Sequence, residues 1–411
     1  MHGTKPHKLK GDCIMQGALS DIRILDLTRV LSGPFAAMWL GDLGADVIKI
    51  ETPVKGDDAR FTPIHVNGKS TFFAAINRNK RSVTLNLKAP EGKAMFLEMV
   101  KQADVVISNF RPGVMERLGL GYDVLSEINE KIIYATISGF GQKGKYAQRP
   151  AYDIISQGMG GIMSTTGVEN GDPIRAGASI GDITAGMNTV IGILAALHAR
   201  SITGKGQCID VAMVDSILAL MPSENMRYFI SGGLVPRTGH RYIGNAPYGV
   251  FKAKDKLFII ACGSDKLFYQ FCDKVLDRPE LKDDERFKIM TKRSDNYYLV
   301  KEIVEEWASK YTADEAVEII LAAGVPAGPI FDMNDIINDE HIVGEREMLV
   351  KVDQPEIGEI LLTNNPIKLS DTKAEIRRLA PALAQHNAEV YGELLGYDEE
   401  KLAQLAADGV I

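Results

Sequence analysis

Hydrophobic and polar positions in the first part of the chain follow an alternation of short apolar runs and amphipathic stretches. The apolar run 22–27 predicts a strand, residues 31–44 a short helix entered through a Ser-Gly-Pro turn, and residues 46–51 a second strand. Such a βαβ unit forms a parallel sheet and leaves a helix N-terminus facing a ligand at the end of its first strand.

The alternation continues beyond this unit. The pattern predicts further strands at 82–88, 103–110, 131–139 and 207–213, a helix at Pro90–Val100, and a long apolar helix that follows Asp182. We therefore expect an α/β fold with a Rossmann-like, doubly wound large domain. There is no G-x-G-x-x-G motif, so a nicotinamide dinucleotide is not indicated.

Residues 232–249 mark a shift in composition, because they are rich in Gly, Pro and basic residues and show little periodicity. Strand-like and helical patterns then follow up to residue 329, and helices are predicted at Met333–Ile337 and Leu379–Leu395. We expect residues 17–225 and 330–411 to form the discontinuous large domain. Residues 226–329 would form a linker and a smaller α+β domain.

Length and composition narrow the functional classes. A chain of 411 residues is long enough for two domains, and its net charge of −7 gives no basic footprint for nucleic acid. The four cysteines are widely spaced without a CxxC motif, which favours a reducing, cytoplasmic setting over a zinc site or a disulfide framework. Residues 1–16 lack an apolar core, so they predict a loose tail and neither a signal peptide nor a membrane segment.

Asp182 is the single acid in a segment of small residues that leads into the long helix. One interpretation is structural: the carboxylate is a helix N-cap that accepts a hydrogen bond from the first turn. The other is chemical, because neighbouring glycines allow a ligand to approach closely and leave the carboxylate little cover. By itself the residue pattern favours the N-cap.

A resemblance favours the chemical interpretation. The segment P-I-R-A-G-A-S-I-G-D-I-T-A-G, with A-Y-D-I-I-S-Q-G-M-G-G before it and G-I-L-A-A-L-H-A-R-S-I-T-G-K-G-Q after it, resembles the class III CoA-transferases. This is the family of formyl-CoA transferase and carnitine CoA-transferase, the CaiB/BaiF type. The resemblance extends from about Leu19 to the C-terminus and implies that Asp182 is the nucleophile.

The resemblance also implies a CoA-binding site at strand and helix ends. Taken from the residues alone, the charged members could equally be solvated surface groups and Phe110 part of the core. The implied CoA contacts are Val30, Leu31, Ser32, Thr52, Leu85, Lys88, Asn109, Phe110, Arg111 and Arg117. The chain departs from some family members, which carry Arg in place of Thr52 and Lys in place of Pro150. Arg149 is a candidate substitute.

Tyr152 bears on which reaction the fold would perform. The related alpha-methylacyl-CoA racemases carry a His directly before the Asp that corresponds to Asp153, because deprotonation beside a thioester needs a general base. Tyrosine has a pKa of about 10 and is a poor base at pH 7, so transferase is favoured over racemase. A non-catalytic acyl-CoA-binding protein is the third candidate. Arg149, Tyr152, Asp153, His240 and Gly244 are predicted pocket residues.

A carboxylate nucleophile exchanges a thioester for an acid through mixed anhydrides and an enzyme thioester, without an accompanying base. We therefore expect CoA and acyl-CoA as substrates, a carboxylic acid as the second substrate, and neither a metal nor a permanently bound cofactor. The resemblance implies an interlinked homodimer, and the charge and composition described above predict no membrane or nucleic-acid partner. The sequence leaves the identity of the two acids open.

Overall fold

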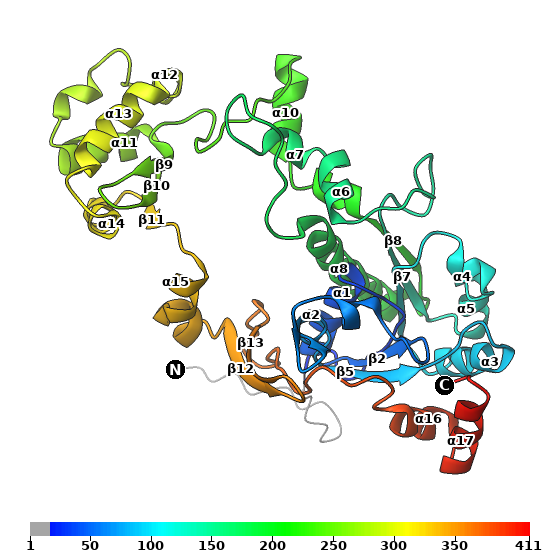
Figure 1. Ribbon diagram of the computed structural model, residues 1–411. Coiled ribbons are helices and arrows are strands. Elements are labelled where there is room, and N and C mark those ends of the chain that lie inside the picture. Colours follow the sequence, from blue (N-terminus) through cyan, green and yellow to red (C-terminus); the bar gives the residue numbers. More distant parts are fainter. Residues whose placement is uncertain (1–16) are drawn as a thin grey trace, which may run out of the picture. The chain divides into compact units, whose positions relative to one another are not determined.

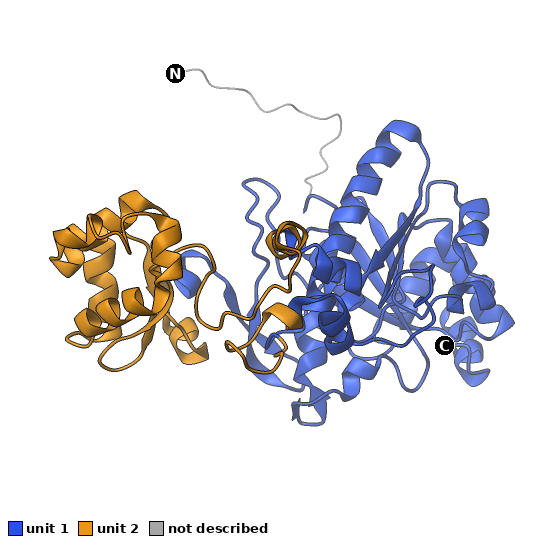
Figure 2. Cartoon of the chain, turned by 90° about the horizontal axis from the view of Figure 1, so that it is seen from above, with its two compact units in different colours: residues 1–162, 176–222, 341–411 blue, residues 163–175, 223–340 orange. Residues whose placement is uncertain are grey.

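The computed structural model describes residues 17–411, so the predicted N-terminal tail lies outside the described residues. The chain forms two compact units (Figure 2). The first comprises residues up to 162 together with 176–222 and 341–411, and the second comprises 163–175 and 223–340. These bounds differ from the predicted domains at 163–175, 223–225 and 330–340. The stretch 163–175 joins the second unit because hydrogen bonds connect Gly167 to Gly239 and Arg237 to Gly171.

A six-stranded parallel sheet organises the first unit (Figure 1). Its order is β5-β2-β1-β6-β7-β8, which is the order of a doubly wound sheet. The strands are β1 (Arg23–Asp26), β2 (Asp46–Glu51), β5 (Lys80–Thr84), β6 (Val105–Ser108), β7 (Ile133–Ser138) and β8 (Cys208–Ala212). The predicted α/β class with a parallel sheet is confirmed. Small antiparallel pairs add β3 (His65–Val66) with β4 (Lys69–Ser70), and β12 (Leu349–Gln354) with β13 (Gly358–Thr363).

Helices cover both faces of the sheet, because its strands are apolar on both sides. One layer contains α1 (Ser32–Asp42), α8 (Ile180–Thr203) and α9 (Met213–Leu218); the other contains α3 (Pro90–Val100), α5 (Tyr122–Ile128), α16 (Asn387–Leu395) and α17 (Glu399–Ala407). Shorter helices of this unit are α2 (Thr71–Ile76), α4 (Val114–Arg117) and α6 (Asp153–Met159).

Helix α8 is, by length and composition alone, apolar enough to cross a membrane. In the structure it packs against α1 and β7, and Ala185, Val190 and Ile193 are buried in the core beside the sheet. It ends at Gly204, whose left-handed backbone caps the helix. Its apolar character is therefore explained by its place in the core of the first unit.

The predicted helix Leu379–Leu395 is too long at its start, since α16 begins at Asn387. The preceding residues form a non-helical stretch that ends in a turn: the Asn79 N–H donates to the Arg378 carbonyl, and the Ser82 N–H donates to His386 Nδ1. Hydrogen bonds to the edge of the sheet thus replace helical ones. The hairpin β12–β13 and helix α17 were not predicted.

The second unit is a small α+β body. Its antiparallel sheet has the order β11-β10-β9, formed by β9 (Tyr248–Lys252), β10 (Leu257–Ala261) and β11 (Ala327–Pro329). The helices are α7 (Ile162–Thr165), α10 (Pro222–Ser231), α11 (Asp265–Phe271) with a π-helical turn Cys272–Leu276, α12 (Met290–Asp295), α13 (Tyr297–Ala308), α14 (Ala313–Ala322) and α15 (Met333–Asn338). A capping box between Thr312 and Glu315 starts α14.

Candidate active site

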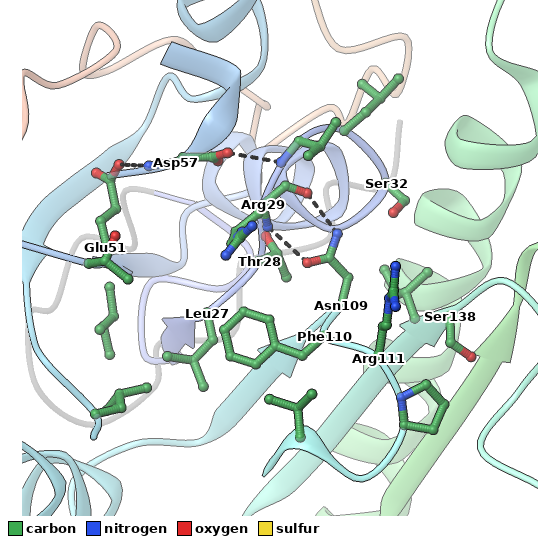
Figure 3. A pocket seen from close by; sticks show the side chains of 18 of the residues that line it. Leu27, Thr28, Arg29, Ser32, Glu51, Asp57, Asn109, Phe110, Arg111 and Ser138 are labelled. Carbon is green, nitrogen blue, oxygen red and sulfur yellow. Dashed lines mark hydrogen bonds between the residues drawn. The ribbon is translucent and has the colours of Figure 1, made fainter. Parts of the chain in front are cut away.

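A cavity of about 740 Å³ opens at the carboxyl edge of the parallel sheet in the first unit. Its walls are the loops that follow β1, β2, β5, β6 and β7 (Figure 3). Strands β1 and β6 are neighbours, and the chain leaves them toward opposite sides of the sheet. This is the topological switch point, where doubly wound sheets bind their ligands.

The cavity brings together most of the predicted site residues. Those that line it are Val30, Leu31, Ser32, Thr52, Leu85, Lys88, Asn109, Phe110, Arg111, Arg149, Tyr152 and Asp182. Four predicted residues do not line it: Arg117, Asp153, His240 and Gly244. Arg29, Asp57, Ser138 and Met213 line it without having been predicted. Met213, which directly follows β8 and starts α9, and Ser138, the last residue of β7, could have been found from their place at a strand end.

Asp182 lies in the first turn of α8 and is not its N-cap. Ser179 occupies the N-cap position, and its side chain makes no capping hydrogen bond. The N–H of Gly181 donates instead to Asp153 Oδ1 at 2.8 Å. The N-cap interpretation of Asp182 is therefore wrong, because the helix begins two residues earlier, at Ile180, and the Asp182 carboxylate lines the cavity.

The surroundings of Asp182 favour its protonated form. Burial, and then the negative charge of Asp153, raise the pKa of Asp182 to about 6. The hydroxyl and the backbone N–H of Ser32 oppose this rise, because both hydrogen-bond the carboxylate. At neutral pH Asp182 is thus mainly ionised, and it is a stronger base than an ordinary aspartate.

Asp153 lies behind Asp182 at the start of α6. Its Oδ1 accepts the Gly181 N–H, and its Oδ2 accepts Gln157 Nε2 at 2.6 Å. Gln157 in turn accepts the backbone N–H of Ala176 at 2.9 Å. The space beside it is tight, since a Cβ at Gly181 would come within 2.3 Å of Ser156 Oγ. Asp153 therefore fixes the start of α8 and adds negative charge near Asp182.

Exposed basic side chains surround the cavity on several loops. Lys88, Arg111 and Arg149 line it and are exposed to solvent, and Arg149 stacks over the Tyr146 ring at 4.1 Å. Arg29 also lines it and pairs with Asp58 at 2.6 Å. Exposed guanidinium and ammonium groups on these loops provide charges of the sign that phosphate groups require.

Tyr152 is 74% exposed and lines the cavity. Among residues 17–411 no histidine lines this cavity, so a neutral-pKa imidazole base is not available there. The same residues hold no group of three or more His, Cys, Asp or Glu side chains arranged for a metal ion.

His240 and Gly244 belong to the second unit. Gly244 donates its N–H to Ser294 Oγ at 3.1 Å, and the carbonyl of His240 accepts the N–H of Val250. At Gly249, which has φ +157, an added Cβ would lie 2.3 Å from the His240 carbonyl oxygen, so no side chain fits there. The structure describes these residues as part of a folded loop against β9.

Comparisons with known proteins agree with this architecture. The family model described as CoA-transferase family III matches residues 19–387. The chain is 44% identical to the acetyl-CoA:oxalate CoA-transferase of Acetobacter aceti, over 90% of this chain and 92% of that protein. It is 37% identical to the succinyl-CoA–D-citramalate CoA-transferase of Chloroflexus aurantiacus, over 96% and 98%.

Among solved structures, a CaiB/BaiF family protein from Brucella suis superposes with a TM-score of 0.80 at 38% identity, covering 92% of this chain and 99% of that one. The predicted resemblance is confirmed by the family model, by sequence relatives and by a solved fold. The chain therefore belongs to CoA-transferase family III.

Proposed function

We propose that this protein transfers CoA from an acyl-CoA donor to a carboxylic acid, with Asp182 as the nucleophile. The observation that carries the proposal is the position of the Asp182 carboxylate in the wall of the cavity at the sheet switch point, beside the N–H and hydroxyl of Ser32. A carboxylate in a cavity of this size, with hydrogen-bond donors beside it, can attack a thioester and return to its starting state.

The reaction would run through four exchanges. Asp182 attacks the donor thioester carbon, the C–S bond breaks, and CoA thiolate leaves behind an acyl-aspartyl anhydride. The thiolate then attacks the Asp182 carbonyl, which releases the donor acid and forms an aspartyl-CoA thioester. The acceptor carboxylate displaces the thiolate to give a second anhydride. The thiolate finally attacks the acceptor acyl carbon, which frees acyl-CoA and restores Asp182.

Two features of the site would assist these steps. The raised pKa of Asp182 strengthens the carboxylate as a nucleophile while leaving most of it ionised at pH 7. The Ser32 N–H and hydroxyl lie where they could stabilise negative charge on the oxygens of the tetrahedral intermediates. No proton has to move in any of the four exchanges, which fits a cavity without a histidine among the described residues.

We infer a dicarboxylic acid as acceptor, because the two curated relatives reported above are named for oxalate and D-citramalate. Arg149 and Arg111 are candidate partners for phosphate groups or for the second carboxylate. A panel of mono- and dicarboxylic acids, tested with acetyl-CoA and succinyl-CoA as donors, would identify the acyl-CoA donor and the acceptor acid. Equal rates with mono- and dicarboxylic acids would contradict the inference.

The test of the nucleophile is chemical trapping. Wild-type enzyme incubated with acyl-CoA and no acceptor should carry an acyl or CoA adduct on the peptide that contains Asp182, and hydroxylamine should remove it. Asp182→Asn should form no adduct and transfer no CoA. Asp215→Asn is the matched control, since Asp215 is an exposed acid on the neighbouring α9 and does not line the cavity.

An active, adduct-free Asp182→Asn variant would reject the nucleophile. A racemase would behave differently in solvent deuterium oxide: deuterium would enter at the alpha carbon of a 2-methylacyl-CoA with no acceptor acid present. We expect no such exchange. Deuterium uptake without CoA transfer would replace the proposed function by the racemase.

A further inference from the structure

The loop between β1 and α1 is strained at Val30, which lines the cavity. Val30 adopts φ +67, a left-handed conformation that a β-branched side chain disfavours. A backbone of this kind persists only where the surrounding structure fixes it. The loop leads within two residues to Ser32, which lines the same cavity as Asp182 and lowers the pKa of that carboxyl.

Side chains from three other segments hold the backbone groups of this loop, and Figure 3 shows two of them, Asn109 and Asp57. Lys49 Nζ on β2 donates to the Thr28 carbonyl at 2.9 Å. Asn109, after β6, accepts the Arg29 N–H at 2.8 Å and donates to the Arg29 carbonyl at 2.7 Å. Asp57 Oδ1 accepts the Val30 N–H at 3.0 Å. Three consecutive residues are thus fixed from outside the loop.

Asp57 and Lys49 form a fully buried ion pair at 2.8 Å. Burial opposes the charged form of Asp57, but the Lys49 ammonium and the N–H donors of Ala59 and Val30 outweigh it, so the pKa of Asp57 is lowered. The pKa of Lys49 is raised for the corresponding reason: burial lowers it, but Asp57 and two further carboxylates outweigh burial. Both groups are charged at neutral pH.

Such a pair is a weak source of stability, because the loss of hydration offsets much of the attraction between the charges. The two Asp57 oxygens accept hydrogen bonds from Val30, Ala59 and Lys49, and Lys49 does not line the cavity. What the pair does fix is the strained loop. Helix α8 packs closely against the end of this loop, since a Cβ added at Gly186 would lie 2.8 Å from the Ser32 carbonyl oxygen.

We propose that Asp57, held by Lys49, is a positioning residue: by fixing the Val30 N–H it keeps the loop in the conformation that aims Ser32 at the Asp182 carboxylate. The inference rests on the proposed role of Asp182 as nucleophile. Asp57 would act through the loop and would not touch the reacting groups. Its loss would displace Ser32 and leave the ionised Asp182 less well stabilised.

The charge that bears on Asp182 comes from Asp153 on α6. Other titratable side chains on the elements that pack against α8 are Asp42 on α1, Tyr134 on β7, Cys208 and Asp210 on β8, and Asp215 on α9. None of them is altered by the variants below except Asp42, which serves as a control.

Two double variants test the positioning role. Lys49→Met/Asp57→Ala and Lys49→Met/Asp57→Asn both remove the buried charges, but only the second keeps an oxygen that can accept the Val30 N–H. With the alanine variant we expect kcat of CoA transfer to fall by about 100-fold, since a displacement of about 1 Å can cost that much. KM for acyl-CoA should stay close to wild type. The asparagine variant should recover most of kcat.

The pH profile separates positioning from a general loss of stability. Ser32 lowers the pKa of Asp182, so its displacement in the alanine variant should shift the acidic limb of the kcat–pH profile, where kcat declines as pH falls, to higher pH. In the asparagine variant Ser32 keeps its place and the limb should not move. Asp42→Asn disrupts another buried ion pair, Arg78–Asp42 at 2.7 Å, away from the loop. It should lower the melting temperature without moving the limb.

Equal kcat and an unmoved limb in both double variants would overturn the inference. Lys49→Met/Asp57→Val, which fills the site with apolar atoms, replaces the alanine variant if the latter does not fold. Failure of the proposed function is a different outcome. In that case wild-type enzyme itself would give no adduct on the Asp182 peptide, whereas failure of the positioning role leaves that adduct intact.

Discussion

Asp182 combines two environments that act on its charge in opposite directions. Burial and Asp153 disfavour the ionised carboxylate, while Ser32 stabilises it. The result is a carboxylate that is ionised at neutral pH at a cost to folding stability. Two measurable consequences follow, one for activity and one for stability.

The first consequence is that activity depends on the ionisation of Asp182 and therefore on pH. Because the pKa of Asp182 is about 6, kcat/KM should decline as pH falls through about 6, rather than near the ordinary value for aspartate. Asp153→Asn removes the charge that helps to raise this pKa, so its acidic limb should lie at lower pH. Initial rates between pH 4 and 8 at saturating acceptor check both statements. A limb that Asp153→Asn leaves unmoved would contradict the assigned cause.

The second concerns stability. The folded-state pKa of Asp182 lies above its unfolded value of 3.8, so its contribution to stability is fully present below that value and is lost as pH rises through about 6. Asp182→Asn should therefore raise the free energy of unfolding at pH 7 by roughly 1–2 kcal/mol, allowing for partial exposure. At pH 3 the gain should vanish. Urea titrations at the two pH values measure the difference, and a variant less stable than wild type at pH 7 would refute it.

Between elements, the contact of α1 with α8 sets the distance from Ser32 to Asp182. Gly186 permits that contact, because an added Cβ would lie 2.8 Å from the Ser32 carbonyl and 2.9 Å from Phe35 Cδ1. At Gly192, six residues further along α8, an added Cβ would lie 3.2 Å from the Ile209 Cγ2 methyl group. The two glycines therefore differ in whether the neighbouring atoms can move.

Gly186→Ala should separate the two helices, lower stability by about 1–3 kcal/mol and reduce kcat. Gly192→Ala should be close to neutral, since a small side-chain shift is offset by the better helix propensity of alanine, up to about 1 kcal/mol. Thermal unfolding and transfer assays on the pair check this. Equal effects of the two substitutions would show that the close approach at Ser32 does not matter.

For the whole molecule, the path of the chain is the notable feature. The chain leaves the first unit, builds the second, and returns at His341 to add β12, β13, α16 and α17 to the first. The return is firmly attached: Arg81 on β5 pairs with Glu393 of α16 at 2.7 Å, and Val390, Tyr391 and Leu394 are buried beside the sheet. A chain that closes on itself in this way is compatible with the interlinked homodimer that the family resemblance implies.

We predict a dimer whose subunits do not exchange while folded, because linked chains cannot separate by simple dissociation. Tagged and untagged dimers mixed under native conditions should give no mixed species on a native gel. Mixed dimers should form only after the two are unfolded and refolded together. Exchange without unfolding would rule out the linkage.

The sequence determined what depends on local pattern. Alternating apolar runs gave the parallel α/β class, because strands buried on both faces must be apolar throughout. The candidate site came mainly from the family resemblance. Twelve of its residues line one cavity, because the carboxyl ends of parallel strands meet at one edge of the sheet. Local pattern failed where distant segments decide the backbone, as in the stretch before α16, which His386 joins to Ser82 of β5 and the Arg378 carbonyl joins to Asn79.

Only the tertiary structure decided the state of Asp182. In the sequence an aspartate among glycines at a helix start is most simply a cap. That interpretation was wrong because α8 begins at Ile180, two residues before Asp182, and Asp153 on another helix holds the Gly181 N–H of its first turn. Asp57 and Lys49 gave no signal at all, since neither their spacing nor their composition reveals that they meet in the core beneath a strained loop. Charge, burial and orientation at this site arise from contacts between segments far apart in the chain, and the fold alone brings those segments together.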